Sequence, residues 1–163
     1  MKHFSMAELT RSTTAQKLGL DNTPTAEHKA NIETMVTKLL DPLREAWAIR
    51  CANEQWGTPA LAVTSGYRGF RLNKEVGGSA TSAHCAGYAA DLVPRNGRLA
   101  EFKAFCREYL ARKAFDQMIS EDENAAGVPR WIHIGYKNAQ GGQRRQLLSM
   151  ITGRIAGYKP MTK

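Results

Sequence analysis

The chain of 163 residues lacks several features that would place it in a common class. No segment approaches the roughly 20 consecutive apolar residues of a membrane-spanning helix, so we expect no stable membrane insertion. The segment from Met1 to Glu8 contains no apolar stretch typical of a secretory signal, which predicts synthesis in a cytoplasm. No Cys-x-x-Cys pair occurs, and the three cysteines are an odd number, which favours reduced thiols over a disulfide framework.

Acidic residues are also scarce, because 15 of them are set against 23 lysines and arginines, giving a formal net charge of +8. Such a charge favours anionic partners, which include nucleic acid, membrane surfaces and bacterial walls. The positive charge is spread along the chain and is locally dense only at 141–145 and at the C-terminal end. No zinc-finger spacing or ribonucleoprotein motif accompanies it, so we predict no nucleic-acid partner.

The remaining composition, with 42% hydrophobic and 23% charged residues, is ordinary for a globular protein, and the length fits one domain over 1–163. Capping patterns predict a short helix after Ser5, followed by turns, and a long helix after Thr25 that Pro42 should kink or divide. Period-two and period-3.6 patterns predict strands at 61–65, 89–93, 115–120, 131–136 and 146–151, a helix at 99–112, a helix or loop at 70–83 and a polar loop at 121–130. This order favours an α+β fold in which N-terminal helices precede a mostly antiparallel sheet with helices packed on it.

Three residues have the chemistry of a metal site. His84 and Asp91 lie in the segment from Ser82 to Leu92, and His133 follows in Trp-Ile-His-Ile-Gly. Two imidazoles and one carboxylate suit a zinc ion that keeps one position open for water, as catalytic sites do. Asp91 and His133 are flanked by apolar residues, where a polar side chain is costly unless a metal or a hydrogen bond compensates it. The alternative to a metal ligand, for each residue taken alone, is a hydrogen-bonded residue of the core.

Arg68 closes the motif Ser-Gly-Tyr-Arg directly after the predicted strand at 61–65. Its guanidinium group offers two parallel hydrogen bonds, which could hold a substrate carboxylate or stabilise a tetrahedral oxyanion. The local sequence alone is equally compatible with a surface arginine.

Taken in order, these motifs resemble the M15 family of zinc peptidases. That family contains D-alanyl-D-alanine carboxypeptidases and phage endolysins, and it shares its fold with the Hedgehog signalling domain. The resemblance covers about residues 4–136 and rests on Ser65-Gly-Tyr-Arg68, Leu72-Asn-Lys-Glu-Val-Gly-Gly-Ser79, Ser82-x-His84-x-x-Gly87-x-Ala89-x-Asp91 and Trp131-x-His133. The segments Phe4-Ser-x-x-Glu-Leu9, Asp21-Asn-Thr-Pro24 and Leu40-Asp-Pro-Leu-Arg44 resemble the phage-encoded branch, and the basic segment 137–163 lies outside the match.

The resemblance implies a Hedgehog-like α+β fold and one zinc ion held by His84, Asp91 and His133. It also implies that Arg68 binds the substrate or stabilises the oxyanion. Tyr67 and Ser82 would shape the substrate-binding site around it.

One departure from the family concerns the general base, because many members carry a glutamate three residues before the last histidine ligand. This chain has Arg130 there, and an arginine cannot accept a proton. The segment Phe115-Asp-Gln-x-Ile-x-Glu121 resembles a phage-branch motif, so we predict Glu121 as the catalytic base. Asp122 and Glu123 remain alternatives, and a solvated acidic loop is the third interpretation of the triplet.

Further residues are candidates for the cleft. Gln117 is predicted to contact the substrate, and Asp116 could reach the cleft if its strand ends near the metal. Trp131 and Tyr136 could form a wall, although core packing is the favoured role of Trp131.

The resemblance implies a zinc metallopeptidase that cleaves peptide-stem amide bonds of bacterial peptidoglycan, either as a D,D-carboxypeptidase or endopeptidase or at the L-Ala–D-Glu bond. A phage or prophage endolysin fits this activity: a monomer made in the host cytoplasm that acts on the periplasmic or extracellular wall during lysis. Two other classes stay open. One is a thiol hydrolase that pairs Cys85 or Cys51 with His133, and the other is a non-catalytic zinc-containing module that binds the wall or a protein.

Overall fold

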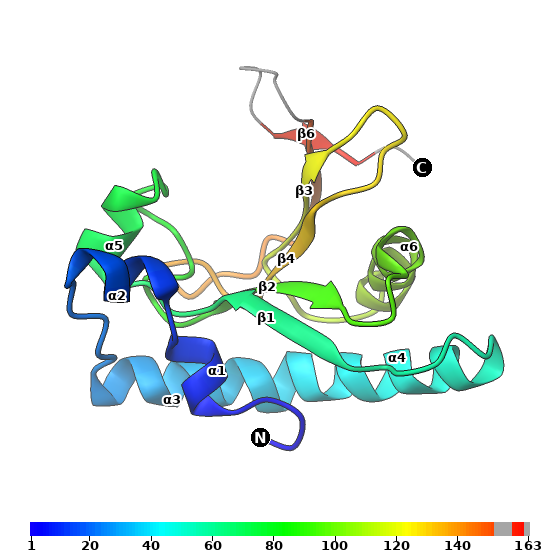
Figure 1. The fold of residues 1–163 in the computed structure, drawn as a ribbon, viewed down its shortest axis with the longest axis horizontal. Coiled ribbons are helices and arrows are strands. Elements are labelled where there is room, and N and C mark those ends of the chain that lie inside the picture. The colour runs from blue at the N-terminus through cyan, green and yellow to red at the C-terminus, as the bar shows by residue number, and fades with distance from the viewer. Residues whose placement is uncertain (152–157, 162–163) are drawn as a thin grey trace.

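A computed structural model describes residues 1–151 and 158–161 of the chain (Figure 1). The helical elements are α1 (Met6–Thr10), α2 (Thr13–Leu18), α3 (Ala26–Met35), the π-helix η1 (Val36–Leu40), α4 (Asp41–Asn53), α5 (Phe70–Glu75) and α6 (Leu99–Leu110). The strands are β1 (Leu61–Ser65), β2 (Ala89–Pro94), β3 (Gln117–Glu123), β4 (Trp131–Gly135), β5 (Gln146–Ile151) and β6 (Lys159–Pro160). Within the described residues they form one six-stranded sheet in the order β1-β2-β4-β3-β5-β6, where the β3–β5 pair is parallel and the other pairs are antiparallel. The predicted α+β class with a mostly antiparallel sheet is confirmed.

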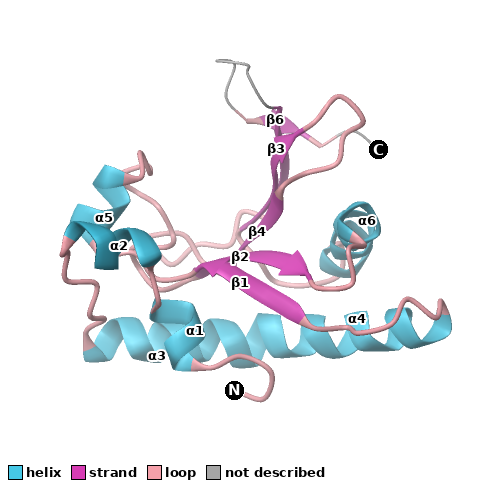
Figure 2. Ribbon diagram, in the orientation of Figure 1, coloured by secondary structure: helices cyan, strands magenta, loops and turns pink. Residues whose placement is uncertain are grey.

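The N-terminal helices begin where the capping patterns predict. Ser5 caps α1 in a capping box with Glu8, and Thr25 caps α3. Pro42 marks the start of α4, but α4 runs in line with α3 below β1 and β2 (Figure 2). The π turns of η1 precede this proline, and the backbone N–H of Asp41 reaches back to the carbonyl of Val36. Because a proline ring clashes with the carbonyl one α-turn earlier, the wider π turns let the helix pass through Pro42 without a sharp kink.

The sheet separates a hydrophobic face from a polar face by the alternation of side chains along each strand. On β2, β3 and β4 the fully buried residues Ala90, Leu92, Met118, Ile132 and Ile134 share the core with residues of α3, α4 and α6. The intervening positions face the other way, and the register places Asp91 opposite His133 and His133 opposite Ile119. Asp91 and His133 therefore share one face of the sheet with Gln117 and Glu121 of β3.

The structure departs from the predicted boundaries at β3, which starts later and continues further than the strand expected at 115–120. The acidic triplet 121–123 therefore belongs to the strand and not to a polar loop. Asp122 has a left-handed backbone with φ of 55°, at a register shift between β3 and β5. Such a bulge adds one residue, so Glu121 keeps the polar face while Glu123 turns to α6, where it binds Lys103.

Two elements were not predicted from the sequence. The helix α2 lies in the segment expected to contain only turns, and β6 extends the sheet beyond β5. Of the predicted basic C-terminal segment 137–163, residues 152–157 and 162–163 lie outside the described residues. Within the described part, no helix is both long and apolar enough to cross a membrane.

Candidate metal centre and its cavity

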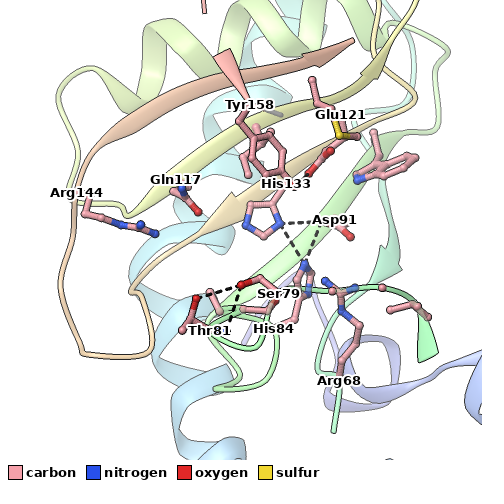
Figure 3. A pocket seen from close by; sticks show the side chains of 18 residues that line it. Arg68, Ser79, Thr81, His84, Asp91, Gln117, Glu121, His133, Arg144 and Tyr158 are labelled. Atoms are coloured by element: carbon pink, nitrogen blue, oxygen red, sulfur yellow. Dashed lines mark hydrogen bonds and ion pairs between the residues drawn. The ribbon is translucent and has the colours of Figure 1, made fainter. Parts of the chain in front are cut away.

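Three side-chain atoms of His84, Asp91 and His133 converge on one point (Figure 3). The Nε2 atom of His84 lies 3.1 Å from Nδ1 of His133 and 3.3 Å from Oδ1 of Asp91. Nδ1 of His133 lies 3.0 Å from the same carboxylate oxygen. The strands β2 and β4 hold Asp91 and His133 opposite each other, and the loop that enters β2 supplies His84. The structure thus brings together the residues that the sequence proposed as metal ligands.

The geometry of this triangle fits a tetrahedral zinc ion. Nitrogen and oxygen ligands about 2.0–2.1 Å from such an ion are about 3.3 Å from one another. The three separations of 3.0, 3.1 and 3.3 Å are close to that value. All three residues are buried, so a cation would also compensate the charge of the enclosed carboxylate.

The backbone holds His84 in the orientation that a metal ligand needs. Its Nδ1 atom lies 2.6 Å from the carbonyl oxygen of Gly66, which can only accept a hydrogen bond. Nδ1 therefore carries the proton, and Nε2 of the neutral ring presents its lone pair to the centre. Burial lowers the pKa of His84, and this effect outweighs the opposing effect of the Asp91 carboxylate. The lowered pKa favours the neutral ring.

The carboxylate of Asp91 is ionised despite its burial. Burial on its own would raise the pKa of this group, but the neighbouring imidazoles of His84 and His133 outweigh that effect and lower it well below its usual range. Two imidazole nitrogens and one carboxylate form the donor set of a catalytic rather than a structural zinc site.

A cavity of about 490 Å³ lies against these ligands. Its wall includes Arg68, Ser82, Gln117, Glu121 and Trp131, together with the turn 76–79, Thr81, Arg144, Met150 and Tyr158. Trp131 is half-buried and lines the cavity, so its favoured role in the core was wrong. Tyr136 packs against the core near Tyr88, and among the described residues it is not part of the cavity wall.

The three acidic candidates for the general base have different surroundings. Glu121 is buried and lines the cavity, and its burial raises its pKa. Asp122 lies 3.1 Å from the guanidinium of Arg130, and Glu123 is bonded to Lys103 on the far face of the sheet. Only Glu121 of the triplet reaches the cavity, and the interpretation as a solvated acidic loop was wrong.

The predicted substrate-binding residues divide into two groups. Arg68, Ser82 and Gln117 line the cavity, whereas Tyr67 is buried against the ring of His28 and is not part of the described wall. Among the described residues the Nε atom of Arg68 is buried without a hydrogen-bond partner. An unpaired buried donor beside a cavity is suited to bind a ligand.

The thiols lack the environment of a nucleophile. Burial raises the pKa of Cys51, Cys85 and Cys106, which disfavours the reactive thiolate form. Neither Cys85 nor Cys51 belongs to the described wall of the cavity. The structure therefore gives no support to a thiol hydrolase.

Several cavity residues were not identified from the sequence. Arg144 and Tyr158 reach the site from segments beyond β4, and no local motif distinguishes them. Asp116, a candidate for the cleft, is instead fully buried in an ion pair with Arg144. The adjacent basic pair Arg144 and Arg145 was visible, but only the fold shows which of the two faces the cavity.

Comparison with known proteins agrees with the site. A family model described as Peptidase M15 matches residues 2–134, which is most of the chain and includes all three candidate ligands. No curated protein matches the chain.

Proposed function

The chain belongs to the peptidase M15 family, and from this premise we propose that it is a zinc metallopeptidase acting on the peptide stems of bacterial peptidoglycan. The observation that carries the proposal is the convergence of His84, Asp91 and His133 beside a cavity that also contains a buried carboxylate and a buried guanidinium donor. A guanidinium donor would serve a binding module as well as an enzyme, but a buried carboxylate beside the metal triangle adds the acid–base group that a hydrolase needs.

The division of roles follows from the geometry. His84, Asp91 and His133 would hold one zinc ion. When bound, zinc supplies a Lewis acid that lowers the pKa of water and polarises a carbonyl oxygen.

Glu121 is the candidate general base because it is the carboxylate of the acidic triplet that lines the cavity. Its carboxylate would accept the proton of the attacking water and return it to the leaving amine. The alternation of side chains along β3 directs Glu121 to the ligand face of the sheet, and the bulge at Asp122 turns only the following Glu123 away.

Arg68 would bind the substrate and stabilise the negative charge that develops on the scissile carbonyl. Its backbone N–H donates to the carbonyl of His84 at 3.2 Å, which fixes the arginine next to a candidate ligand. Ser82 and Gln117 also line the cavity and add polar groups to it.

The test is the release of amino groups from purified peptidoglycan, with mass spectrometry of the products. Wild type and the His84→Ala variant are compared with and without a chelator. We expect cleavage by the wild type alone, lost with the chelator and restored by zinc, and product masses that distinguish D,D-cleavage from cleavage at L-Ala–D-Glu. Cleavage that resists the chelator would contradict a metallopeptidase.

A non-catalytic zinc-containing module that binds the cell wall or a protein is the second candidate, because Arg130 occupies the position where many family members carry a glutamate. A folded, zinc-loaded wild type that binds peptidoglycan without cleaving it would favour that module. The position of Glu121 in the cavity favours the enzyme.

We further propose that the protein serves as a phage or prophage endolysin, a monomer made in the host cytoplasm that reaches the wall during lysis. The net charge of +8 supports this role, since bacterial walls are anionic. Expression in a bacterial host should leave the cells intact until the membrane is permeabilised. Lysis should then follow for wild type and not for His84→Ala.

A further inference from the structure

The cavity contains a second guanidinium group that the proposed function does not use. Arg144 lines the cavity, and its side chain extends toward Gln117 and His133 (Figure 3). Figure 3 also shows Arg68 on the opposite side of the three candidate ligands. A peptide bond placed at the ligands would therefore have one arginine on each side.

Asp116 holds Arg144 in a fixed orientation. Nε and Nη2 of the arginine donate to the two carboxylate oxygens of Asp116, each at 2.7 Å, and the backbone N–H of Arg144 lies 3.2 Å from Oδ1. The side chain of Asp116 has 0% exposure, whereas 44% of the Arg144 side chain is exposed. Such a two-point ion pair is costly to bury and fixes the plane of the guanidinium.

The pairing leaves one edge of the guanidinium for a ligand. Asp116 occupies the Nε and Nη2 edge, and Nη1 makes no hydrogen bond within the described residues. A rotationally fixed guanidinium loses little conformational freedom when it binds a carboxylate. Gln117 also lines the cavity. Its amide nitrogen donates one hydrogen bond to Gln146 at 2.8 Å, and its second N–H can donate to the same carboxylate.

We propose that Arg144 is a specificity-determining residue that binds a side carboxylate of the peptide substrate, on the opposite side of the scissile bond from Arg68. Asp116 is its positioning residue. This inference rests on the proposed function, and it narrows the substrate class to peptide stems whose side carboxylates are free rather than amidated.

The test uses two stem peptides of identical sequence that both keep the C-terminal carboxylate. One has free side carboxylates, and in the other these groups are amidated. The wild-type protein with zinc should prefer the acidic peptide by about tenfold or more in kcat/KM, since hydrogen bonds between charged groups are strong. Arg144→Gln should remove this preference, mainly by raising KM for the acidic peptide. Arg144→Lys should restore part of it.

Arg145→Gln is the matched control, because Arg145 is the neighbouring residue and donates to the carbonyl of Ala111 outside the described cavity wall. It should keep the wild-type preference. Arg144→Gln leaves the buried carboxylate of Asp116 without its ion-pair partner. The double variant Asp116→Asn/Arg144→Gln therefore tests the loss of preference for the acidic peptide in a chain without that unpaired charge. Thermal unfolding of each variant shows which of them are folded.

Equal losses on both peptides in folded Arg144→Gln, or an unchanged preference, would overturn the assignment. Equilibrium binding of the two peptides to zinc-free wild type and Arg144→Gln separates this inference from the proposed function. If the acidic peptide binds more tightly only to wild type while no peptide is hydrolysed, the carboxylate site stands and the peptidase proposal fails. If both peptides are hydrolysed at equal rates and bound with equal affinity, the peptidase proposal stands and the carboxylate site at Arg144 fails.

Discussion

The Nδ1 atom of His84 lies 2.6 Å from the carbonyl oxygen of Gly66, and this contact connects the candidate metal centre to the first helix. The next backbone N–H along the chain, that of Tyr67, donates to the carbonyl of Leu9 at 2.6 Å. A side chain at Gly66 would collide with the backbone of Leu9. The glycine therefore allows α1 to pack against the turn that orients a metal ligand.

Gly66→Ala should weaken zinc binding although it changes no ligand. The added methyl group must displace the turn from Leu9, and the carbonyl that fixes the tautomer of His84 moves with it. We expect a loss of about 10–100-fold in zinc affinity, measured by competition with a chelating dye. Gly69→Ala is the matched control, because its methyl group would meet only ordinary contacts, the nearest at 3.4 Å from Asn22. Wild-type affinity in Gly66→Ala would refute the argument.

Zinc should stabilise the fold through Asp91 and its two histidine neighbours. A ligand that binds only the folded state adds about 2.7 kcal/mol when it is present at 100 times its Kd. Zinc should therefore raise the unfolding temperature of wild type by about 5–10 °C, given the scaling for a chain of this size. Asp91→Asn removes the anionic ligand and should abolish the rise in a calorimetric scan. An equal rise in both proteins would place the metal elsewhere.

Glu121→Gln separates the proton-transfer role from metal binding. The amide cannot accept the proton of the attacking water, so kcat should fall by about 10²–10⁴-fold. Zinc affinity should stay close to that of wild type, because Glu121 is not part of the converging triangle. Asp122→Asn is the control, since Asp122 pairs with the exposed Arg130. Comparable losses in both variants would argue against Glu121 as the base.

The ligand set could be predicted from the sequence because its members lie in short motifs with strong local signals. His84 and Asp91 belong to one continuous segment, and the strands around Asp91 and His133 have clear apolar patterns. The fold class followed from the order of the same patterns. In contrast, the predicted boundaries of β3 were wrong. The acidic triplet 121–123 has the composition of a loop, and its place in the strand depends on pairing with distant strands.

The rest of the cavity wall could not be predicted, for a physical reason. Arg144 and Tyr158 reach the site only because β5 pairs in parallel with β3 and β6 then pairs with β5. Neither residue lies in a motif that specifies this pairing. The bulge at Asp122 could not be predicted either, because no neighbouring residue indicates that this aspartate has a left-handed backbone.

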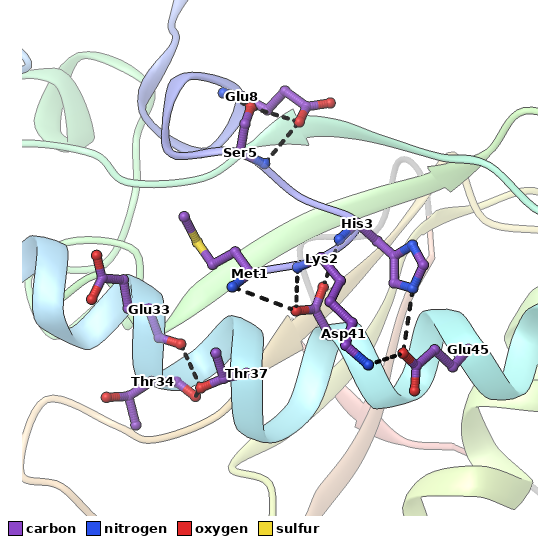
Figure 4. A network of polar contacts seen from close by, with 10 residues as sticks. All are labelled: Met1, Lys2, His3, Ser5, Glu8, Glu33, Thr34, Thr37, Asp41 and Glu45. Carbon is purple, nitrogen blue, oxygen red and sulfur yellow. Dashed lines mark hydrogen bonds and ion pairs between the residues drawn. The ribbon is translucent and has the colours of Figure 1, made fainter.

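Asp41 should make a large contribution to stability at the start of α4 (Figure 4). This buried carboxylate accepts the backbone N–H groups of Lys2 and His3 at 2.7 and 3.0 Å, which ties the first residues to the helix. Asp41→Asn loses the charge and part of the acceptor capacity. We expect a loss of about 1–3 kcal/mol in the free energy of unfolding, measured with denaturant. Glu45→Gln is the control and should cost less, because its contacts with Lys2 and His3 are at the exposed surface.

The pair of Lys103 and Glu123 should make stability depend on pH. Burial opposes ionisation of Glu123, but hydrogen bonds from Lys103 and Ser149 outweigh it, so the pKa of Glu123 in the folded state lies below its ordinary value of 4.5. A carboxyl group with a lowered pKa contributes stability above its unfolded pKa, and this contribution is lost as the pH falls through the folded pKa.

Lys103→Met should therefore destabilise the protein at neutral pH, and the difference from wild type should shrink below about pH 4.5, the ordinary pKa of glutamate. Denaturant unfolding at a series of pH values measures this difference. Lys38→Met, at an exposed lysine, should show no such trend. A difference for Lys103→Met that stays constant down to the acid limit would mean that packing of the lysine stem, and not its charge, stabilises the strand.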